Sequence, residues 1–290
     1  MTIAPPAVPV LAGDVWRARE AAHEERARAL TSAHRERASR GEAHPVEDFL
    51  FTYYSYKPSV LHRWHPGEGV ELADAAADAR AGWRWYRPGT TRGSIAVDGA
   101  GFRAGRGVLV ANVGRILRAT ADRPPGFGCF GLHEWAMVYR KPQHRHPVPL
   151  RLGQDRTDEV VEAHELRCTH FDAFRFFTPE AAPRNRETPT REQQAELEQP
   201  GCLHAGMDLY KWAVKLGPLV PGELLLDTFE LARDIRVLDM RASPYDLADW
   251  GYDAVPIETA DGKAAYVRAQ RTFADRGRAI RDRLLDVAAG

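Results

Sequence analysis

Apolar residues recur every three to four positions over most of the C-terminal half of the chain. This spacing covers residues 203–216, 222–242 and 262–287, and it is typical of helices with one buried face. Between the last two helices, the segment "YDAVPIETADGKAAYV" predicts a short hairpin. The C-terminal half is therefore expected to be mostly helical.

The N-terminal region predicts one long helix. Residues 15–40 are rich in Ala, Arg and Glu, and Asp14 is a suitable N-cap for them. The apolar stripe of this helix is thin, which favours a position across the surface. Residues 1–13 are rich in proline, and we expect a flexible arm there.

The middle of the chain mixes glycine, β-branched and aromatic residues, which indicates a small β component between about residues 85 and 178. "VPLRLG" is strand-like, and "CTHFDAFRFFT" is interpreted as a strand that turns into a helix. Helices are expected over 108–120, from about 131, and over 157–164.

These patterns together predict an α+β fold, predominantly helical, with one domain over residues 14–290. No internal repeat and no domain boundary is visible. Residues 179–200 are polar and bounded by prolines, so a mobile loop is expected there.

Composition narrows the function classes. Lys plus Arg and Asp plus Glu number 40 each, so the formal net charge is zero. A dedicated nucleic-acid binder usually has a basic excess, although a local basic face remains compatible with neutrality. The 3 cysteines imply no disulfide framework. No apolar run is long enough to span a membrane, so we expect a cytoplasmic protein without a membrane partner.

The segment "CTHFDAFRFFT" places polar groups among phenylalanines. Burying a polar group is costly unless something pairs with it. We therefore expect this segment to line an apolar pocket with a polar floor, where His170 and Asp172 do acid–base chemistry and Phe174 contacts the substrate.

A histidine follows each cysteine closely: Cys129 precedes His133, Cys168 precedes His170, and Cys202 precedes His204. Imidazole is a common ligand of divalent metals. We predict that His133, His170 and His204 converge and hold a divalent cation. The alternative is that the cysteines are small buried hydrophobes and that each histidine is paired locally.

The helix over 203–216 carries His204, Asp208, Lys211 and Lys215 on one face. Asp208 and Lys211 are therefore candidate substrate contacts. The alternative is a solvated face with ordinary ion pairs.

In "GLHEWAMVYR", Glu134 follows a glycine-rich turn and adjoins Trp135. A carboxyl group against an apolar wall has a raised pKa and can act as an acid, and Trp135 is a candidate substrate contact. The alternative role of Glu134 is to stabilise a helix N-terminus.

Two stretches combine aromatic and basic residues. "TYYSYKPSVLHRWHPG" contains Tyr53, Tyr54 and Trp64, and the other stretch is "GWRWYRPGTTRG". Aromatic faces stack on bases and arginines hold phosphates, so both stretches are candidate contacts to DNA. The alternative is core aromatics flanked by solvated arginines.

Blocks spread along nearly the whole chain resemble an actinobacterial family commonly labelled 3-methyladenine DNA glycosylase. They are "HPVEDFLFTYYSYKPSVLHRWHPG", "GCFGLHEWAMVYR", "HFDAFRFFT", "PGCLHAGMDLYKWAVKL" and "ELARDIRVLDMRASPYDL". The resemblance implies excision of alkylated bases from DNA. "LVPGELLLD" is similar to the hairpin of helix-hairpin-helix glycosylases, with Leu224 in place of its second glycine. By that likeness, Asp239 lies where the catalytic carboxylate is expected.

Asp239 also has a structural interpretation, an ion-pair network with Arg241 and Asp246. Two function hypotheses follow from the sequence. One is a base-excision hydrolase acting on alkylated DNA, and the other is a metal-dependent enzyme acting on a small molecule through a histidine-rich apolar pocket.

Overall fold

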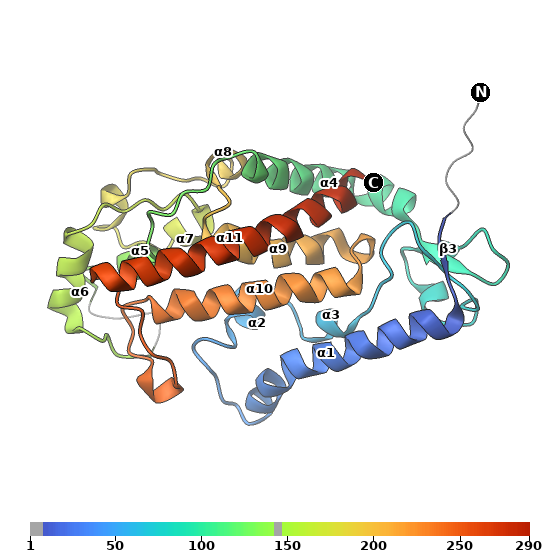
Figure 1. Cartoon of the computed structure of the whole chain (residues 1–290), viewed down its shortest axis with the longest axis horizontal. Helices are drawn as coiled ribbons and strands as arrows, with labels where there is room; N and C mark the ends of the chain where they lie inside the picture. Colours follow the sequence, from blue (N-terminus) through green and yellow to red (C-terminus); the bar gives the residue numbers. More distant parts are fainter. Residues whose placement is uncertain (1–7, 142–146) are drawn as a thin grey trace.

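The computed structural model describes residues 8–141 and 147–290. The chain is predominantly helical with one small sheet, as the sequence predicts. In Figure 1 the long helices run side by side, with the sheet at one end of the molecule and α6 at the other. The helices are α1 (Gly13–Ser39), α2 (Phe49–Tyr53), α3 (Ser59–His62), α4 (Gly99–Ala121), α5 (Leu132–Ala136), α6 (Gly153–Glu162), α7 (Phe171–Phe174), α8 (Gln194–Leu197), α9 (Leu203–Leu216), α10 (Gly222–Arg241) and α11 (Ala260–Ala289).

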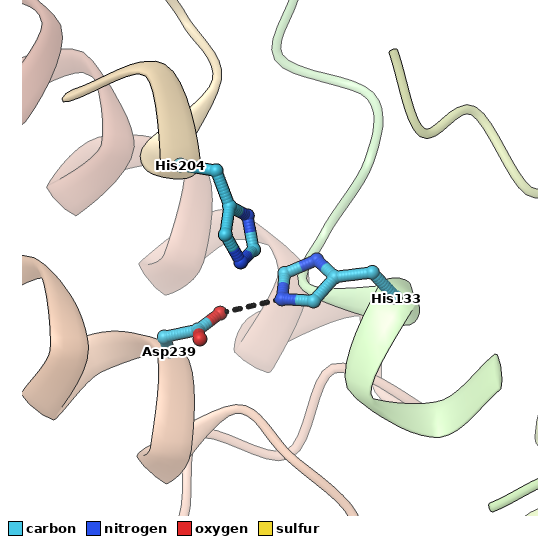
Figure 2. Close-up of side chains that lie close together, drawn as sticks. All are labelled: His133, His204 and Asp239. Atoms are coloured by element: carbon cyan, nitrogen blue, oxygen red, sulfur yellow. Dashed lines mark ion pairs between the residues drawn. The ribbon is translucent and has the colours of Figure 1, made fainter. Parts of the chain in front are cut away.

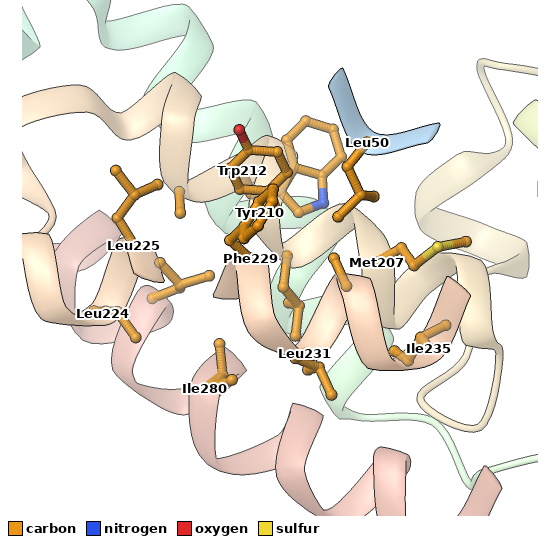
Figure 3. Packing of buried hydrophobic residues seen from close by; sticks show 14 of the residues in the cluster. Leu50, Met207, Tyr210, Trp212, Leu224, Leu225, Phe229, Leu231, Ile235 and Ile280 are labelled. Atoms are coloured by element: carbon orange, nitrogen blue, oxygen red, sulfur yellow. The ribbon is translucent and has the colours of Figure 1, made fainter. Parts of the chain in front are cut away.

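Helices α9 and α10 form the centre of the fold. Both carry bulky apolar residues on the faces that meet, and α11 and α4 pack against them. Figure 3 shows Tyr210 of α9 beside Phe229 of α10, and the centroids of the two rings are 5.2 Å apart. Full burial of a side chain of this size contributes roughly 1.5–3 kcal/mol. This core holds the two helices in a fixed register.

Gly217 ends α9 and starts the turn to α10. Its φ of 58° is unfavourable for residues with a Cβ, and a Cβ there would lie 3.3 Å from the Phe102 ring. Pro218 and Pro221 follow at once, so the chain reverses within a few residues.

The sheet is built from four very short strands in the order β1-β2-β4-β3. Strand β1 pairs parallel to β2, and the other pairs are antiparallel. The strands are β1 (Val10–Leu11), β2 (Glu71–Leu72), β3 (Tyr86–Pro88) and β4 (Ile95–Val97).

The predicted place of the β component is therefore right only in part. Strands β3 and β4 lie within residues 85–178, whereas β1 and β2 precede residue 85, and residues 148–153 and 168–178 contribute no strand to the sheet. Leu150 and Leu166 make only isolated bridges, and within "CTHFDAFRFFT" residues 171–174 form α7. The hairpin expected at 252–267 is absent, because α11 already begins at Ala260.

Two expectations about the N-terminus also change. Val10–Leu11 pairs with β2, so this part of the expected arm belongs to the sheet, whereas residues 1–7 lie outside the described residues. Helix α1 begins at Gly13 with Ala12 as its N-cap, which places Asp14 in the first turn.

Residues 179–200 pack against the rest of the molecule at both ends. Ala181, Asn185 and Glu198 are buried, and α8 lies against α4. Most residues of the central part, 186–193, are exposed, although Pro189 is buried. Mobility of that central part stays a prediction.

Within the described ranges, no helix combines the length and the hydropathy that crossing a bilayer demands.

Candidate functional site

Three side chains from different helices meet in the interior: His133 of α5, His204 of α9 and Asp239 of α10 (Figure 2). The His133 Nε2 atom lies 2.9 Å from Asp239 Oδ1, and the rings of His133 and His204 are 4.4 Å apart. One ligand atom from each residue falls within 4.8 Å of the other two. We call these residues the first set.

The turn before α5 is shaped to bring His133 into place. Gly131 has a φ of 73°, and a Cβ there would stand 3.3 Å from the Tyr266 ring and 3.4 Å from Ala242 Cβ. Only glycine fits both the left-handed backbone and the close approach of α10 and α11.

Hydrogen bonding in the first set is incomplete. His133 Nε2 and Asp239 Oδ1 are buried, yet neither makes a hydrogen bond of acceptable geometry within the part of the chain that the structure describes. The other oxygen of Asp239 accepts from Arg236 Nη1 at 3.0 Å, and Arg236 also donates to Glu134 at 2.8 Å. His133 Nε2 and Asp239 Oδ1 therefore approach each other closely, but not in the direction of a hydrogen bond.

A second set lies beside the first: His170 before α7, Glu198 after α8, and Asp208 of α9. His170 Nε2 is 3.1 Å from Glu198 Oε1 and 3.3 Å from Asp208 Oδ2, and each of the three side chains is only 2% exposed. Asp208 also accepts from the Tyr54 hydroxyl at 2.8 Å and from Lys211. Unlike the carboxylate of the first set, both carboxylates of this set are fully engaged, and its one buried atom without a hydrogen bond among the described residues is His170 Nδ1.

The two sets affect the protonation of their histidines differently. Burial opposes protonation of His170, but Glu198 and Asp208 outweigh it and raise the pKa of His170 to about 9. Burial also opposes protonation of His133, and Asp239 outweighs it, so the pKa of His133 is raised. For His204, burial and the neighbouring His133 hold the pKa well below its usual value. His204 is therefore a neutral imidazole with a lone pair to share.

The predicted convergence of the three histidines is confirmed, because the rings of His170 and His204 are also only 5.2 Å apart. Their ligand atoms nevertheless belong to two sets rather than one. Helix α9 links the sets, since His204 and Asp208 stand one turn apart on it and each belongs to one set.

Two narrow cavities meet at His204, which lines both. One is lined by His133 and by all three cysteines, Cys129, Cys168 and Cys202. Burial raises the pKa of each thiol, that of Cys168 to about 12. Among the described residues no cysteine joins a group of potential metal ligands. Cys168 and Cys202 are buried, as expected of small hydrophobes, whereas Cys129 is half-buried.

The other cavity holds most of the remaining predicted residues. Its empty volume is about 520 Å³ including its open mouth, and its lining includes Tyr53, Tyr54, Glu134, His170, Asp172, Asp208 and Arg236. Asp172 pairs with Arg175 at 3.1 Å and with Arg191 at 3.3 Å, and it lies 3.8 Å from Lys211. Phe176 lines this cavity, whereas Phe174 packs against Phe177.

Three assignments from the sequence need correction. Trp64 is buried against Trp16, and Trp135 is fully buried and donates to the Ala242 carbonyl, so both are core residues and not substrate contacts. The network of Asp239 with Arg241 and Asp246 is also wrong. Arg241 instead bonds the Asp253 carbonyl, and Asp246 accepts from the backbone of Ala248.

Two residues of the site were missed by the sequence analysis. Glu198 lies in a segment that was interpreted as a loop, and Arg236 lies on the same helix as Asp239, one turn before it. The spacing of Arg236 and Asp239 was the available signal for the second residue. For Glu198 the sequence carries no such signal, because its partners are distant in the chain.

The chain was compared with protein-family models, with curated proteins and with solved structures, and none of the three comparisons gives a match.

Proposed function

We propose that this protein is a metal-dependent hydrolase of a small molecule, with one divalent cation held by His133, His204 and Asp239. The observation that carries the proposal is the convergence of these three donors, where His133 Nε2 and Asp239 Oδ1 form a buried ion pair of 2.9 Å that lacks hydrogen-bond geometry. Buried polar atoms without a well-directed hydrogen bond are rare in proteins and call for a further partner. A cation between the three side chains would supply it.

The donor types favour Zn²⁺ or Fe²⁺. Two imidazoles and one carboxylate are a common protein ligand set for these ions, and three protein ligands leave a position for water or substrate. A cation in such a site lowers the pKa of bound water and creates a nucleophile near neutral pH.

The charges around the first set agree with a bound cation. Asp239 and Glu134 share one guanidinium, that of Arg236, so with a neutral His133 the buried group carries a net negative charge. The guanidinium also fixes the Asp239 oxygen that does not face His133. Such outer partners commonly orient metal ligands.

The second set suits proton transfer better than metal binding. The Lys211 ammonium already lies against Asp208 Oδ2, where a metal ion would bind, and the Tyr54 hydroxyl donates to Asp208 Oδ1. His170 lines the larger of the two cavities that meet at His204, and its Nδ1 atom has no hydrogen-bond partner among the residues described. His170 is thus placed to donate a proton to a leaving group.

The test is metal content. Protein purified without chelators should carry about one equivalent of a transition metal, or take up one Co²⁺ with visible absorption bands, as a three-ligand site requires. His204→Gln and Asp239→Asn should lose the metal and the bands, while His164→Gln, just after α6, should keep both. A wild-type chain that stays metal-free after incubation with Zn²⁺, Fe²⁺ and Co²⁺ would contradict the proposal.

Base excision on alkylated DNA is a second candidate. The observation that favours it is the aromatic lining of the larger cavity, where Phe49, Tyr53 and Phe176 line the same space as Asp172. Aromatic walls suit a flipped base. Under this candidate, the protein releases 3-methyladenine from alkylated duplex DNA and Asp172→Asn abolishes release.

A further inference from the structure

A broad groove lies at the end of α9 that is remote from the two sets. Two stretches separated in sequence form its walls: Arg63 and His65 follow α3, and residues 83–86 lead into β3. Ala213 and Val214 of α9 contribute to the lining. The groove encloses about 960 Å³ including its open mouth.

The groove is separate from the candidate active site. His204 and Val214 are both on α9, ten residues apart, and a helix rises 1.5 Å per residue, so about 15 Å of helix divides the groove from the first set. None of the residues that line the groove belongs to either set.

The side chains of the groove are aromatic and cationic. Trp83, Trp85 and Tyr86 line it, the guanidinium of Arg63 lies 5.2 Å from the Trp83 ring, and that of Arg84 lies 4.4 Å from the Trp85 ring. No aspartate or glutamate of the described chain is among its lining residues. In a protein of zero net charge, this groove is a local basic and aromatic surface.

The two indoles differ from the aromatic residues of the core. Trp64 is buried and Tyr86 is nearly so, and Tyr86 is held by His65 through a hydrogen bond of 2.9 Å. Trp83 and Trp85 are only partly buried, and Arg84 is exposed. The groove therefore offers ring surface and guanidinium groups to a ligand.

We propose that this groove binds a nucleotide, with its base stacked on the Trp83 and Trp85 indoles and its phosphate paired with Arg63 and Arg84. Base–indole stacking contributes about 1–3 kcal/mol for each base. Guanidinium groups form charge-assisted hydrogen bonds with phosphate. The same chemistry is carried by a free mononucleotide and by the end of a single strand.

The test is a titration of the purified chain at low salt, followed by tryptophan fluorescence and calorimetry. The probes are AMP, adenosine, inorganic phosphate and a short oligothymidylate. AMP is expected to quench fluorescence and to bind more tightly than adenosine or phosphate. If only the oligothymidylate binds, the ligand of the groove is the end of a single strand. If AMP binds as tightly as the oligothymidylate, the ligand is a free mononucleotide.

Variants locate the binding. Trp83→Leu and Arg84→Gln should each weaken binding about tenfold, which corresponds to about 1.4 kcal/mol. Arg84 is exposed, so its substitution is not expected to affect folding. Arg87→Gln on β3, outside the groove, is the matched control and should bind as the wild type does. The proposal is overturned if no probe binds, if phosphate binds as well as AMP, or if both groove variants bind unchanged.

Discussion

Arg236 is the buried cation that pairs with two carboxylates of the candidate site, those of Glu134 and Asp239. Its side chain is 1% exposed, it donates to Glu134 and to Asp239, and it lies 3.8 Å from the Phe49 ring. Removing one partner of a buried ion pair leaves an uncompensated charge, which is far more costly than the pair itself is stabilising.

Arg236→Met should therefore lower the free energy of unfolding by about 3–5 kcal/mol. Methionine keeps most of the apolar volume, so the loss of stability reflects the two unpaired carboxylates and not a cavity. Urea unfolding followed by circular dichroism measures it. Arg233→Met, one turn earlier on α10 and exposed, should change stability by about 0.5 kcal/mol at most. Equal effects of the two variants would contradict the role of Arg236.

Single residues were predictable from the sequence where the partner lay on the same element. The helical spacing of His204, Asp208 and Lys211 was visible, and so was the repeated pairing of cysteine with histidine. The partners of these groups were not visible. The contact of His170 with Glu198 depends on how a polar segment folds back on α4, and no local pattern encodes that path.

At the scale of elements, Glu71 connects β2 to the turn between β3 and β4. Its carboxylate accepts from Ser94 Oγ at 2.6 Å, from Thr90 N at 2.7 Å and from Thr90 Oγ1 at 2.8 Å. The hydrogen bond from Ser94, followed by the one from the Thr90 backbone, lowers the pKa of Glu71 to about 2. One side chain thus holds the antiparallel half of the sheet.

Glu71→Gln should lower stability by about 1–3 kcal/mol at neutral pH, because charge-assisted hydrogen bonds are lost. The folded pKa lies below the unfolded one, so the stabilisation is complete above about pH 4.5 and is lost as the pH falls toward 2. The stability difference between wild type and variant should shrink from about pH 7 to about pH 3. Glu36→Gln, exposed on α1, is the control. A difference that does not depend on pH would contradict the role of Glu71.

Long periodic helices were predictable, and the short strands were not. The expected helix at 203–216 matches α9, and that at 222–242 matches α10 within one residue. Strands β1 and β2 have two residues each and pair across about sixty positions of sequence. Two residues are too few to show a period, and the pairing is set by the packing of α1 and not by local preference.

At the scale of the whole molecule, the segment 179–200 contacts both α4 and the candidate site. Arg123, just after α4, donates to the Glu198 carbonyl, and the Glu198 side chain contacts His170 and accepts from Gln194. Asn185 holds the backbone of Cys168 through two hydrogen bonds. The segment is thus anchored where it meets the site and exposed between the anchors.

Trypsin is expected to cut the native chain at Arg186 and Arg191, in the exposed centre of this segment. Cleavage of a folded chain requires local opening, and its rate follows the free energy of that opening. Glu198→Ala removes an anchor worth about 1–3 kcal/mol, so cleavage there should accelerate at least about fivefold. Glu196→Ala, exposed on α8 two residues earlier, should leave the rate unchanged. Mass spectrometry of the first fragments identifies the cut. Equal rates in both variants would mean that the buried carboxylate does not hold the segment in place.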